Sequence, residues 1–445
     1  MLDIVRGKCI DISSEGKGVV KIGKYIYFVD GLFVGEEADI EVLYQRAGVY
    51  FGKVKKLISI SKDRIQPRCK ICTSCGGCQY QQINYKTQLE YKTKRVKEAL
   101  SRIAHIKCDV LPCVGANNPY NYRNKIQVPF VKDKKGVVKY GFYKENSHII
   151  MPIKECAIED KRAAPILWDV KLLLEEMNIP AYNEDSGKGI LRYILIRTSY
   201  HYDELMVVLV TTQMNFPGQR NFVNELVNRH PEITTVVENV NSRHTNVILG
   251  NQEKILYGPG HIKDDILGLT FEISAASFFQ INPEQVEKLY TYALNLIDFN
   301  KKEVVLDAYS GVGTIGLIAA RNAKKVISVE INKSAHKNAI ENAKRNNIDN
   351  IEFYCADAGE FISKYDGDID VLIMDPPRSG GDETFLSTVM NKRIKKIVYI
   401  SCNPETLSRD VEYLSKLYEV KYVQPVDMFP NSSHTETVLS LILKN

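Results

Sequence analysis

The chain has 445 residues, of which 44% are hydrophobic and 25% are charged. This length and composition fit a globular protein with two or three domains, each with its own core. No apolar run approaches the roughly 20 residues of a membrane span, and the first residues lack the apolar stretch of a signal peptide. We therefore expect a cytoplasmic protein without a membrane partner, whose ten cysteines are thiols or metal ligands rather than disulfides.

Positive charge is concentrated in the first third of the chain. The formal net charge is +5, but residues 1–144 contain 27 Lys and Arg against 13 Asp and Glu, whereas the remainder is acidic overall. A basic N-terminal region indicates a polyanionic partner such as nucleic acid. The alternative is a solvated basic face that binds nothing.

Residues 1–60 consist of short alternating segments separated by glycines, for example 16–20, 25–29 and 39–43. Short strands, turn signals and the absence of a convincing helix predict a small five-stranded barrel of the OB type, a fold that commonly binds nucleic acid. The stretch also resembles the TRAM domain of RNA-modifying enzymes.

Four cysteines follow at a constant spacing of three residues: Cys69, Cys72, Cys75 and Cys78. A tight loop of this kind can hold iron or zinc through soft thiolate ligands. The spacing is close to that of ferredoxin ligands but differs at its last step. Four thiolates packed so tightly would strain to hold one cubane cluster, so we expect three local ligands and one distant cysteine, Cys156. Zinc and a purely structural thiol cluster are the alternatives.

Residues 83–103 predict a helix whose apolar stripe runs beside several cations. The stripe is Leu89, Val96, Leu100 and Ile103, and the cations are Lys92, Lys94, Arg95 and Lys97. Residues 120–150 return to strands in which aromatic and cationic side chains interleave, as RNA binding by stacking and phosphate contact would require. A plain solvated hairpin is the alternative there. A helix over 161–178 and strands over 190–211 continue a mixed α+β region.

From about residue 271 strands alternate with helices, which predicts a doubly wound parallel sheet. The strand over 304–307 is followed by the glycine loop Gly311-x-Gly313-x-x-Gly316 at the start of a helix. Such a loop fits a dinucleotide as well as S-adenosylmethionine. Two strand-end carboxylates favour S-adenosylmethionine, because Asp307 at the end of this strand can receive its ammonium and Asp357 at a later strand end can take its adenine amine. Glu330 can hold its ribose hydroxyls.

Two corners at later strand ends carry the reactive groups. Asp375 is followed by Pro376 and Pro377, which would present rigid acceptors beside a transferred methyl group; a simple rigid turn is the alternative. Cys402 follows the apolar strand 397–400, at the edge where ligands bind in open α/β sheets. A thiol there is either a nucleophile or a small core residue.

Taken together, these motifs resemble the RNA uracil-C5 methyltransferases, and within them the iron–sulfur branch that acts on 23S rRNA. The resemblance covers essentially the whole length and rests on the barrel, on Cys75-Gly76-Gly77-Cys78-Gln79, Phe279-Gln280-Ile281-Asn282, Asp375-Pro376-Pro377-Arg378, Ser401-Cys402-Asn403-Pro404 and His434-Thr435-Glu436.

The resemblance implies a role for each matching residue. Cys402 would be the nucleophile and Glu436 the base. The S-adenosylmethionine contacts would be Gln280, Tyr309, Thr314, Glu330, Asp357 and Asp375. The ligands of a [4Fe-4S] cluster would be Cys69, Cys75, Cys78 and Cys156. Cys72 is extra to that pattern, so the choice between Cys69 and Cys72 stays open.

The predicted architecture has three parts: a TRAM-like barrel over 1–60, a central α+β domain with the cysteines over 61–270, and a Rossmann-like methyltransferase domain over 271–445. The expected partner is 23S rRNA, with the target uridine flipped out of a loop or single strand, and the expected protein is a monomer. A tRNA T-loop uridine and two sites in 23S rRNA are the alternative substrates. A radical enzyme, an amino-methyltransferase and a non-catalytic RNA-binding module are the rival classes.

Overall fold

The computed structural model describes residues 3–133, 136–144, 147–243 and 247–444. The chain divides into two compact units. Unit 1 combines residues 1–119, 376–386 and 398–445, and unit 2 combines residues 120–375 and 387–397. Helix α9 (Glu383–Lys392) and strand β19 (Lys396–Ser401) each pass from one unit to the other along the chain.

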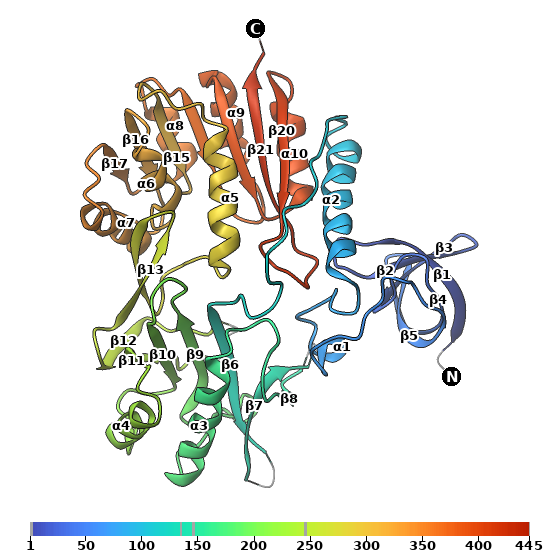
Figure 1. The fold of residues 1–445 in the computed structure, drawn as a ribbon, viewed down its shortest axis with the longest axis vertical. Helices are drawn as coiled ribbons and strands as arrows, with labels where there is room; N and C mark the ends of the chain where they lie inside the picture. The colour runs from blue at the N-terminus through green and yellow to red at the C-terminus, as the bar shows by residue number, and fades with distance from the viewer. Residues whose placement is uncertain (1–2, 134–135, 145–146, 244–246, 445) are drawn as a thin grey trace. The chain divides into compact units, whose positions relative to one another are not determined.

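Unit 1 begins with a closed five-stranded barrel of order β1-β2-β3-β5-β4 (Figure 1). Its strands are β1 (Ile4–Ile12), β2 (Gly18–Ile22), β3 (Tyr25–Asp30), β4 (Glu37–Arg46) and β5 (Val49–Ser59). The barrel closes because β1 pairs antiparallel with both β2 and β4, while β3 runs parallel to β5. Alternate residues such as Val20, Val29 and Ile40 fill its core. The predicted five-stranded barrel is confirmed.

The rest of unit 1 places a long helix and a strand pair around the end of the chain. It contains α1 (Cys72–Cys75), α2 (Tyr85–Arg102), α10 (Pro404–Leu414), β20 (Tyr418–Val426) and β21 (Glu436–Leu443). Asn84 caps α2 by accepting a hydrogen bond from the Thr87 amide at 3.0 Å. Strands β19, β21 and β20 lie side by side in that order, and β20 pairs antiparallel with β21.

Helix α2 differs from the expected basic helix in one respect. Lys92 is 1% exposed, although lysine is almost never fully buried without a partner. It lies four residues before Val96 and eight before Leu100, so it shares their buried face. Lys94 and Lys97 are exposed, as expected for cations on the solvent side.

Unit 2 begins with a seven-stranded sheet of order β12-β11-β10-β9-β6-β7-β8. Its strands are β6 (Lys125–Lys132), β7 (Val138–Tyr143), β8 (Ile150–Pro152), β9 (Leu191–Thr198), β10 (Leu205–Thr211), β11 (Thr235–Val240) and β12 (Gln252–Tyr257). Helices α3 (Ala163–Glu176) and α4 (Gln219–Arg229) pack their apolar residues against it. The hairpin of β13 (His261–Ile266) and β14 (Leu269–Ser274) follows.

The last part of unit 2 is a set of parallel strands in the order β17-β16-β15-β18. They are β15 (Val304–Ala308), β16 (Lys325–Val329), β17 (Ile351–Tyr354) and β18 (Val371–Met374). The helices that accompany them are α5 (Pro283–Asn295), α6 (Thr314–Ala320), α7 (Lys333–Arg345) and α8 (Ala358–Lys364). The alternation of strand and helix predicted from residue 271 is confirmed. Among the described residues, no helix is both long and apolar enough to cross a membrane.

Candidate functional site: a cofactor loop and a thiol corner

The glycine loop of unit 2 turns sharply between β15 and α6. Tyr309, Gly311 and Gly313 have φ angles of 63°, 57° and 80°, in the left-handed region. Glycine adopts this region without strain, whereas tyrosine does so at a cost of order 1–3 kcal/mol, and such outliers gather at functional sites. The turn brings backbone N–H groups to the N-terminus of α6, where they can meet a ligand.

Glu330 fixes that loop from the end of β16. One of its carboxylate oxygens accepts a hydrogen bond from the Gly311 amide at 2.8 Å, and the other accepts one from the Asn332 amide at 2.7 Å. The predicted ribose contact therefore also holds the loop in shape. Each oxygen keeps a second lone pair for a ligand hydroxyl.

Asp307, at the end of β15, is a buried carboxyl group that lacks a full set of partners. It is 1% exposed, and its Oδ2 atom accepts no hydrogen bond from any described group. Burial and the nearby carboxyls of Asp375 and Glu330 raise the pKa of Asp307 well above its ordinary value. Burial also raises the pKa of Asp375 to about 7.

A cationic ligand would relieve this crowding of carboxyl groups. Gly316 leaves the space beside the Asp307 carboxyl group open, because a Cβ atom at position 316 would lie 2.5 Å from Asp307 Oδ2. The ammonium and sulfonium groups of S-adenosylmethionine have the charge that three converging acids favour. The residues at these strand ends therefore fit this cofactor.

The other predicted cofactor contacts lie at the starts of helices or in the segment before a helix. Thr314 is the first residue of α6 and is buried. Asp357 caps α8, since its Oδ1 accepts from the Glu360 amide at 3.0 Å, which leaves Oδ2 for a ligand. Gln280 is half-buried in the segment between β14 and α5, and the Asn124 side chain donates to its carbonyl at 3.0 Å.

The thiol corner of unit 1 lies between β19 and α10. Cys402 is half-buried, directly after the strand, and Asn403 caps the helix by accepting from the Glu405 amide at 3.1 Å. Pro404 occupies the first turn of the helix, where its missing N–H costs nothing. The corner thus holds a partly exposed thiol directly before the N-cap of a helix.

The segment that begins with Pro376 is tied to this corner. The carbonyl of Arg378 accepts hydrogen bonds from Asn403 at 3.3 Å and from Thr406 at 3.1 Å. Asp410, which is fully buried on α10, accepts from Tyr399 Oη at 2.6 Å and from the Gly381 amide at 2.7 Å. These bonds fix the thiol corner and the Pro-Pro-Arg corner as one body.

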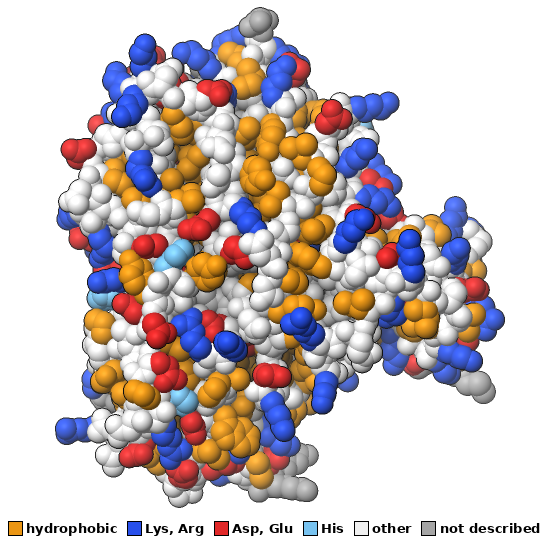
Figure 2. All heavy atoms as spheres, in the orientation of Figure 1, with side chains coloured by type: hydrophobic (Ala, Val, Ile, Leu, Met, Phe, Trp, Pro, Cys, Tyr) orange, Lys and Arg blue, Asp and Glu red, His pale blue; other side chains and the backbone are white. Residues whose placement is uncertain are grey.

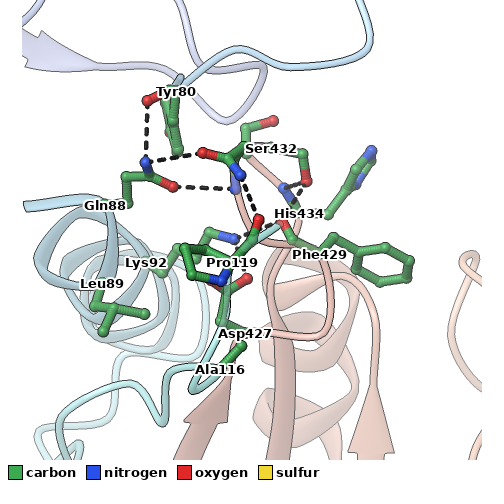
Figure 3. Close-up of polar contacts among 12 residues, drawn as sticks. Tyr80, Gln88, Leu89, Lys92, Ala116, Pro119, Asp427, Phe429, Ser432 and His434 are labelled. Atoms are coloured by element: carbon green, nitrogen blue, oxygen red, sulfur yellow. Dashed lines mark hydrogen bonds and ion pairs between the residues drawn. The ribbon is translucent and has the colours of Figure 1, made fainter. Parts of the chain in front are cut away.

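Glu436 begins β21, is 8% exposed, and follows a loop that is packed on α2 (Figure 3). In this loop, Asp427 forms a buried ion pair with Lys92 and accepts from Tyr85 Oη at 2.8 Å. Lys92 also donates to the Phe429 carbonyl at 3.1 Å. Lys92 therefore stabilises the loop that leads to Glu436 by holding Asp427 and Phe429 against α2.

Gln88 reinforces the same loop one turn earlier on α2. Its side chain accepts from the Asn431 amide at 3.0 Å and donates to the Tyr80 carbonyl at 3.1 Å (Figure 3). Asn431 has a φ of 68°, so the turn before Glu436 is held in a conformation that asparagine tolerates better than most residues.

Arg95 joins the thiol corner to the loop before Glu436. Its guanidinium donates to both carboxylate oxygens of Glu405, at 3.0 and 2.7 Å, and to the Ser433 carbonyl at 2.9 Å. Glu405 is three residues after Cys402, and Ser433 is three residues before Glu436. One side chain of α2 therefore bridges the segments that carry the predicted nucleophile and base.

The cysteine segment folds around the single turn of α1. Gly76 ends it with a φ of 71°, and the Cys75 amide donates to the Ile71 carbonyl at 2.9 Å. Burial and the neighbouring thiols of Cys75, Cys69 and Cys72 raise the pKa of Cys78 to about 12. Gln79 then links this segment to the loop before Glu436, because it donates to the Gly76 carbonyl at 2.6 Å and accepts from the Ser433 amide at 3.2 Å.

Cys156 lies in unit 2, half-buried after β8. All ten cysteines of the chain are thiols in the structure. Within the described ranges, no three Cys, His, Asp or Glu side chains are arranged to hold a metal ion. The donor atoms of the cysteine segment suit a soft metal, and the ligand set predicted for them stays a prediction.

The barrel and the two sets of site residues define a class. A mixed α/β fold with a glycine loop, strand-end carboxylates and an N-terminal barrel is that of an S-adenosylmethionine-dependent methyltransferase. The half-buried thiol corner and Glu436 belong to the same chain.

Comparison with known proteins gives the particular family. Residues 242–444 match the family described as tRNA (Uracil-5-)-methyltransferase. A Staphylococcus epidermidis protein described as an uncharacterized RNA methyltransferase is 40% identical over 446 residues, which cover 99% of this chain and 98% of that protein. A Staphylococcus aureus protein of the same description is also 40% identical over 446 residues, with the same coverage of both chains.

A solved structure matches over nearly the whole chain as well. It is the tRNA (uracil-54, C5)-methyltransferase of Pyrococcus abyssi in complex with S-adenosyl-L-homocysteine, with a TM-score of 0.81 and 28% identity. The match covers 98% of this chain and 100% of that one. The chain belongs to the RNA (uracil-5-)-methyltransferase family, and its methyl donor is S-adenosylmethionine.

Several residues that shape the site carried no local signal in the sequence. Lys92 and Arg95 were expected among the cations of a basic helix, and the structure turns them toward acids over 300 positions away. Asp410 had no motif at all. Only a pairing of distant positions, such as covariation between 95 and 405, could have found them.

Proposed function

We propose that the chain methylates C5 of a specific uridine in 23S rRNA, with Cys402 as the nucleophile and Glu436 as the base. The observation that supports this most is the thiol corner: a half-buried cysteine between a strand end and a capped helix, joined through Arg95 to the loop of a buried glutamate.

The mechanism follows from the chemistry of the pyrimidine ring. Carbon C5 of uracil is a poor nucleophile, so the Cys402 thiolate adds to C6, and the electron pair of the C5–C6 double bond becomes available at C5. S-adenosylmethionine, when bound, supplies the methyl group that C5 accepts. Glu436 then takes the proton from C5, the double bond re-forms, and the C6–S bond breaks to release Cys402. General base catalysis of this kind is typically worth 10²–10⁴-fold in rate.

The cofactor would be held by the strand-end residues of unit 2. Asp307 would accept the methionyl ammonium through its unpartnered Oδ2, and Asp357 would accept an adenine amine. Glu330 would hold the ribose hydroxyls beside the Gly311 amide. Gln280, Tyr309, Thr314 and Asp375 complete the proposed set.

We also propose that the cysteine segment binds a [4Fe-4S] cluster through Cys69, Cys75, Cys78 and Cys156, with Cys72 as the alternative to Cys69. The soft thiol donors of the segment and its tight turn at Gly76 support this. The hydrogen bond that the Ser433 amide donates to Gln79 suggests a structural role for the cluster, because order in the cysteine segment would stabilise the loop before Glu436. Iron and sulfide analysis of protein purified without oxygen tests the proposal; zinc in their place would contradict it.

The surface of the barrel supports a role in RNA binding. Tyr44 is 54% exposed and stacks on Phe51 with ring centroids 4.8 Å apart, and Lys53, Lys55 and Lys56 are exposed on the neighbouring strand. Lys and Arg side chains lie beside apolar ones on the visible face of the barrel (Figure 2). Phosphate binding there would offset the few kcal/mol needed to flip the target base.

A tRNA T-loop uridine is the second candidate substrate. The Pyrococcus abyssi enzyme, described as acting on uracil-54 of tRNA, is matched by 98% of this chain. The match extends into the barrel, so a barrel alone does not separate the two substrates. The cysteine segment is the feature that favours 23S rRNA, through the resemblance to the iron–sulfur branch. We propose that the protein acts as a monomer in the cytoplasm, with one uridine or two as its target.

Trapping with 5-fluorouridine tests the chemistry. The base can remove a proton from C5 but cannot remove a fluorine atom from it, so elimination is blocked. The wild-type protein should therefore stay attached to the RNA in a denaturing gel. Cys402→Ala should lose both the adduct and methylation, whereas Cys355→Ala, which removes an exposed thiol, should keep both. With unmodified RNA, Glu436→Gln should accumulate the adduct, whereas Glu419→Gln on the exposed side of β20 should not. Methylation by the Cys402→Ala variant would refute the nucleophile.

Mapping of 5-methyluridine tests the substrate. RNA from a strain that lacks the gene should lose the modification at one or two positions of 23S rRNA and keep it in tRNA. Loss from the T-loop of tRNA with an unchanged 23S rRNA would replace the first candidate by the second.

A further inference from the structure

Three cations converge on one face of the central sheet of unit 2. Lys125 on β6 lies directly opposite Arg197 on β9 in the antiparallel register, and Arg123 precedes Lys125 by two residues. Directly opposite residues point to the same face, and like charges in such a pair destabilise a sheet. The arrangement costs stability unless something compensates for it.

The described residues supply no carboxylate that forms an ion pair with these cations. Arg197 is 3% exposed and donates through one nitrogen to the carbonyls of Ala275 and Ser277. Its Nε atom, like that of Arg123, is buried and has no partner among the described groups. Each neutral carbonyl satisfies a hydrogen bond but leaves the positive charge in place.

The nearby acids do not neutralise the cluster. Glu159 faces Arg123, but burial raises the pKa of Glu159 to about 7, so it carries only part of a negative charge at neutral pH. Glu253 is the acid that faces Arg197, and it hydrogen-bonds Asn239 instead. Burial and the two arginines lower the pKa of Lys125 to about 8. The cluster is therefore an unneutralised positive site.

The position of the cluster suggests the kind of anion. Arg197 and Asn124 hold the segment that runs from Ala275 to Gln280. In this segment Phe278 is 70% exposed, an unusual state for a ring that could be buried. A partly exposed lysine opposite an arginine that holds a segment with an exposed aromatic ring is a combination that suits a single strand, by phosphate contact and stacking.

We propose that Lys125, Arg197 and Arg123 form a binding site for a backbone phosphate of the RNA substrate. Lys125 is half-buried and makes the direct contact, while the two arginines supply positive potential and hold the neighbouring segment. The carboxylate of S-adenosylmethionine is the alternative anion that these cations could bind. It is disfavoured because the cofactor as a whole carries net positive charge, which three cations would repel. This proposal needs an RNA substrate but not a particular one.

The experiment compares Lys125→Met with Lys132→Met, an exposed lysine on the same strand. Binding of labelled 23S rRNA and tRNA transcripts is measured between 50 and 300 mM salt, about the range over which counterion release is resolved. Lys125→Met should weaken binding of the substrate transcript about 3- to 10-fold and reduce the slope of log K against log salt by about 0.7–0.9, the value for one phosphate contact. Lys132→Met should change neither quantity.

Two further measurements separate the outcomes. Because Lys125 opposes two like charges, Lys125→Met should melt at an equal or higher temperature than the wild type in the absence of RNA, which excludes misfolding as the cause of weak binding. Its affinity for S-adenosylhomocysteine should be unchanged. Weaker S-adenosylhomocysteine binding with unchanged RNA binding would assign the site to the cofactor carboxylate and overturn the proposal. An unchanged salt slope, or an equal effect of Lys132→Met, would also overturn it.

Discussion

Replacing Arg95 by methionine should slow catalysis without abolishing it. The change removes two hydrogen bonds to the Glu405 carboxylate and one to the Ser433 carbonyl, and it keeps most of the apolar stem of the side chain. Hydrogen bonds to charged groups contribute about 1.5–3 kcal/mol each when shielded from water. The side chains of Arg95 and Glu405 are 17% and 37% exposed, so solvent screening lowers their contribution.

A total of about 1–3 kcal/mol is therefore expected for the coupling of the two loops. Since each 1.36 kcal/mol of activation free energy is tenfold in rate, kcat should fall about 5- to 150-fold. The effect should appear in kcat rather than in KM, because Arg95 holds the nucleophile and base segments and does not bind the substrate. It should also raise the fraction of enzyme trapped as the RNA adduct, since proton removal by Glu436 depends on the loop that Ser433 belongs to.

Lys94→Met is the matched control. Lys94 is the preceding residue on α2, and its side chain is 49% exposed and pairs with Asp11. Such surface pairs contribute about 0–1 kcal/mol, so the control should keep its kcat within a factor of two. Steady-state methylation with radiolabelled donor measures both variants. If Arg95→Met lowers the melting temperature but leaves kcat and the adduct fraction unchanged, its role is structural and the bridge is irrelevant to catalysis.

Two other predictions concern buried charges. Asp375 has a pKa raised to about 7 from 3.8, so between about pH 4 and pH 7 the folded protein holds a proton that the unfolded chain releases. The contribution of Asp375 to stability is therefore greatest at low pH and is lost as the pH rises through 7, and S-adenosylmethionine should raise the melting temperature more at pH 8 than at pH 6. Asp375→Asn should flatten this pH dependence, and an unchanged profile would contradict the assignment. Lys92→Met leaves Asp427 buried without its cation, which should lower the free energy of unfolding by about 3–5 kcal/mol in urea titrations. A loss as small as that of Lys94→Met would show that the buried pair is dispensable.

Local patterns in the sequence were enough to identify the helices and strands and the functional groups at the strand ends. Alternation and glycine spacing predicted the barrel, and the change to strand–helix alternation predicted the parallel sheet, because both patterns depend on neighbours within one segment. Asp307, Gly311, Gly313 and Cys402 could be placed for the same reason, since Asp307 ends a predicted strand and the others lie in the segments that follow predicted strands. Glu436 depended on resemblance alone, as nothing in the residues around it marks a base.

The pairing of side chains across long separations in sequence became apparent only in the folded chain. Lys92 and Arg95 look alike in the sequence, yet Lys92 is buried against Asp427 and Arg95 bridges Glu405 and Ser433. These pairs could not be predicted from local patterns, because Lys92 is 335 positions from Asp427 and Arg95 is 310 positions from Glu405. The opposition of Lys125 and Arg197 likewise depends on strand register. The sequence gives the sign of a charged side chain but not the group that it contacts. That contact determines whether the side chain stabilises the fold, positions a reacting group or is available to a ligand.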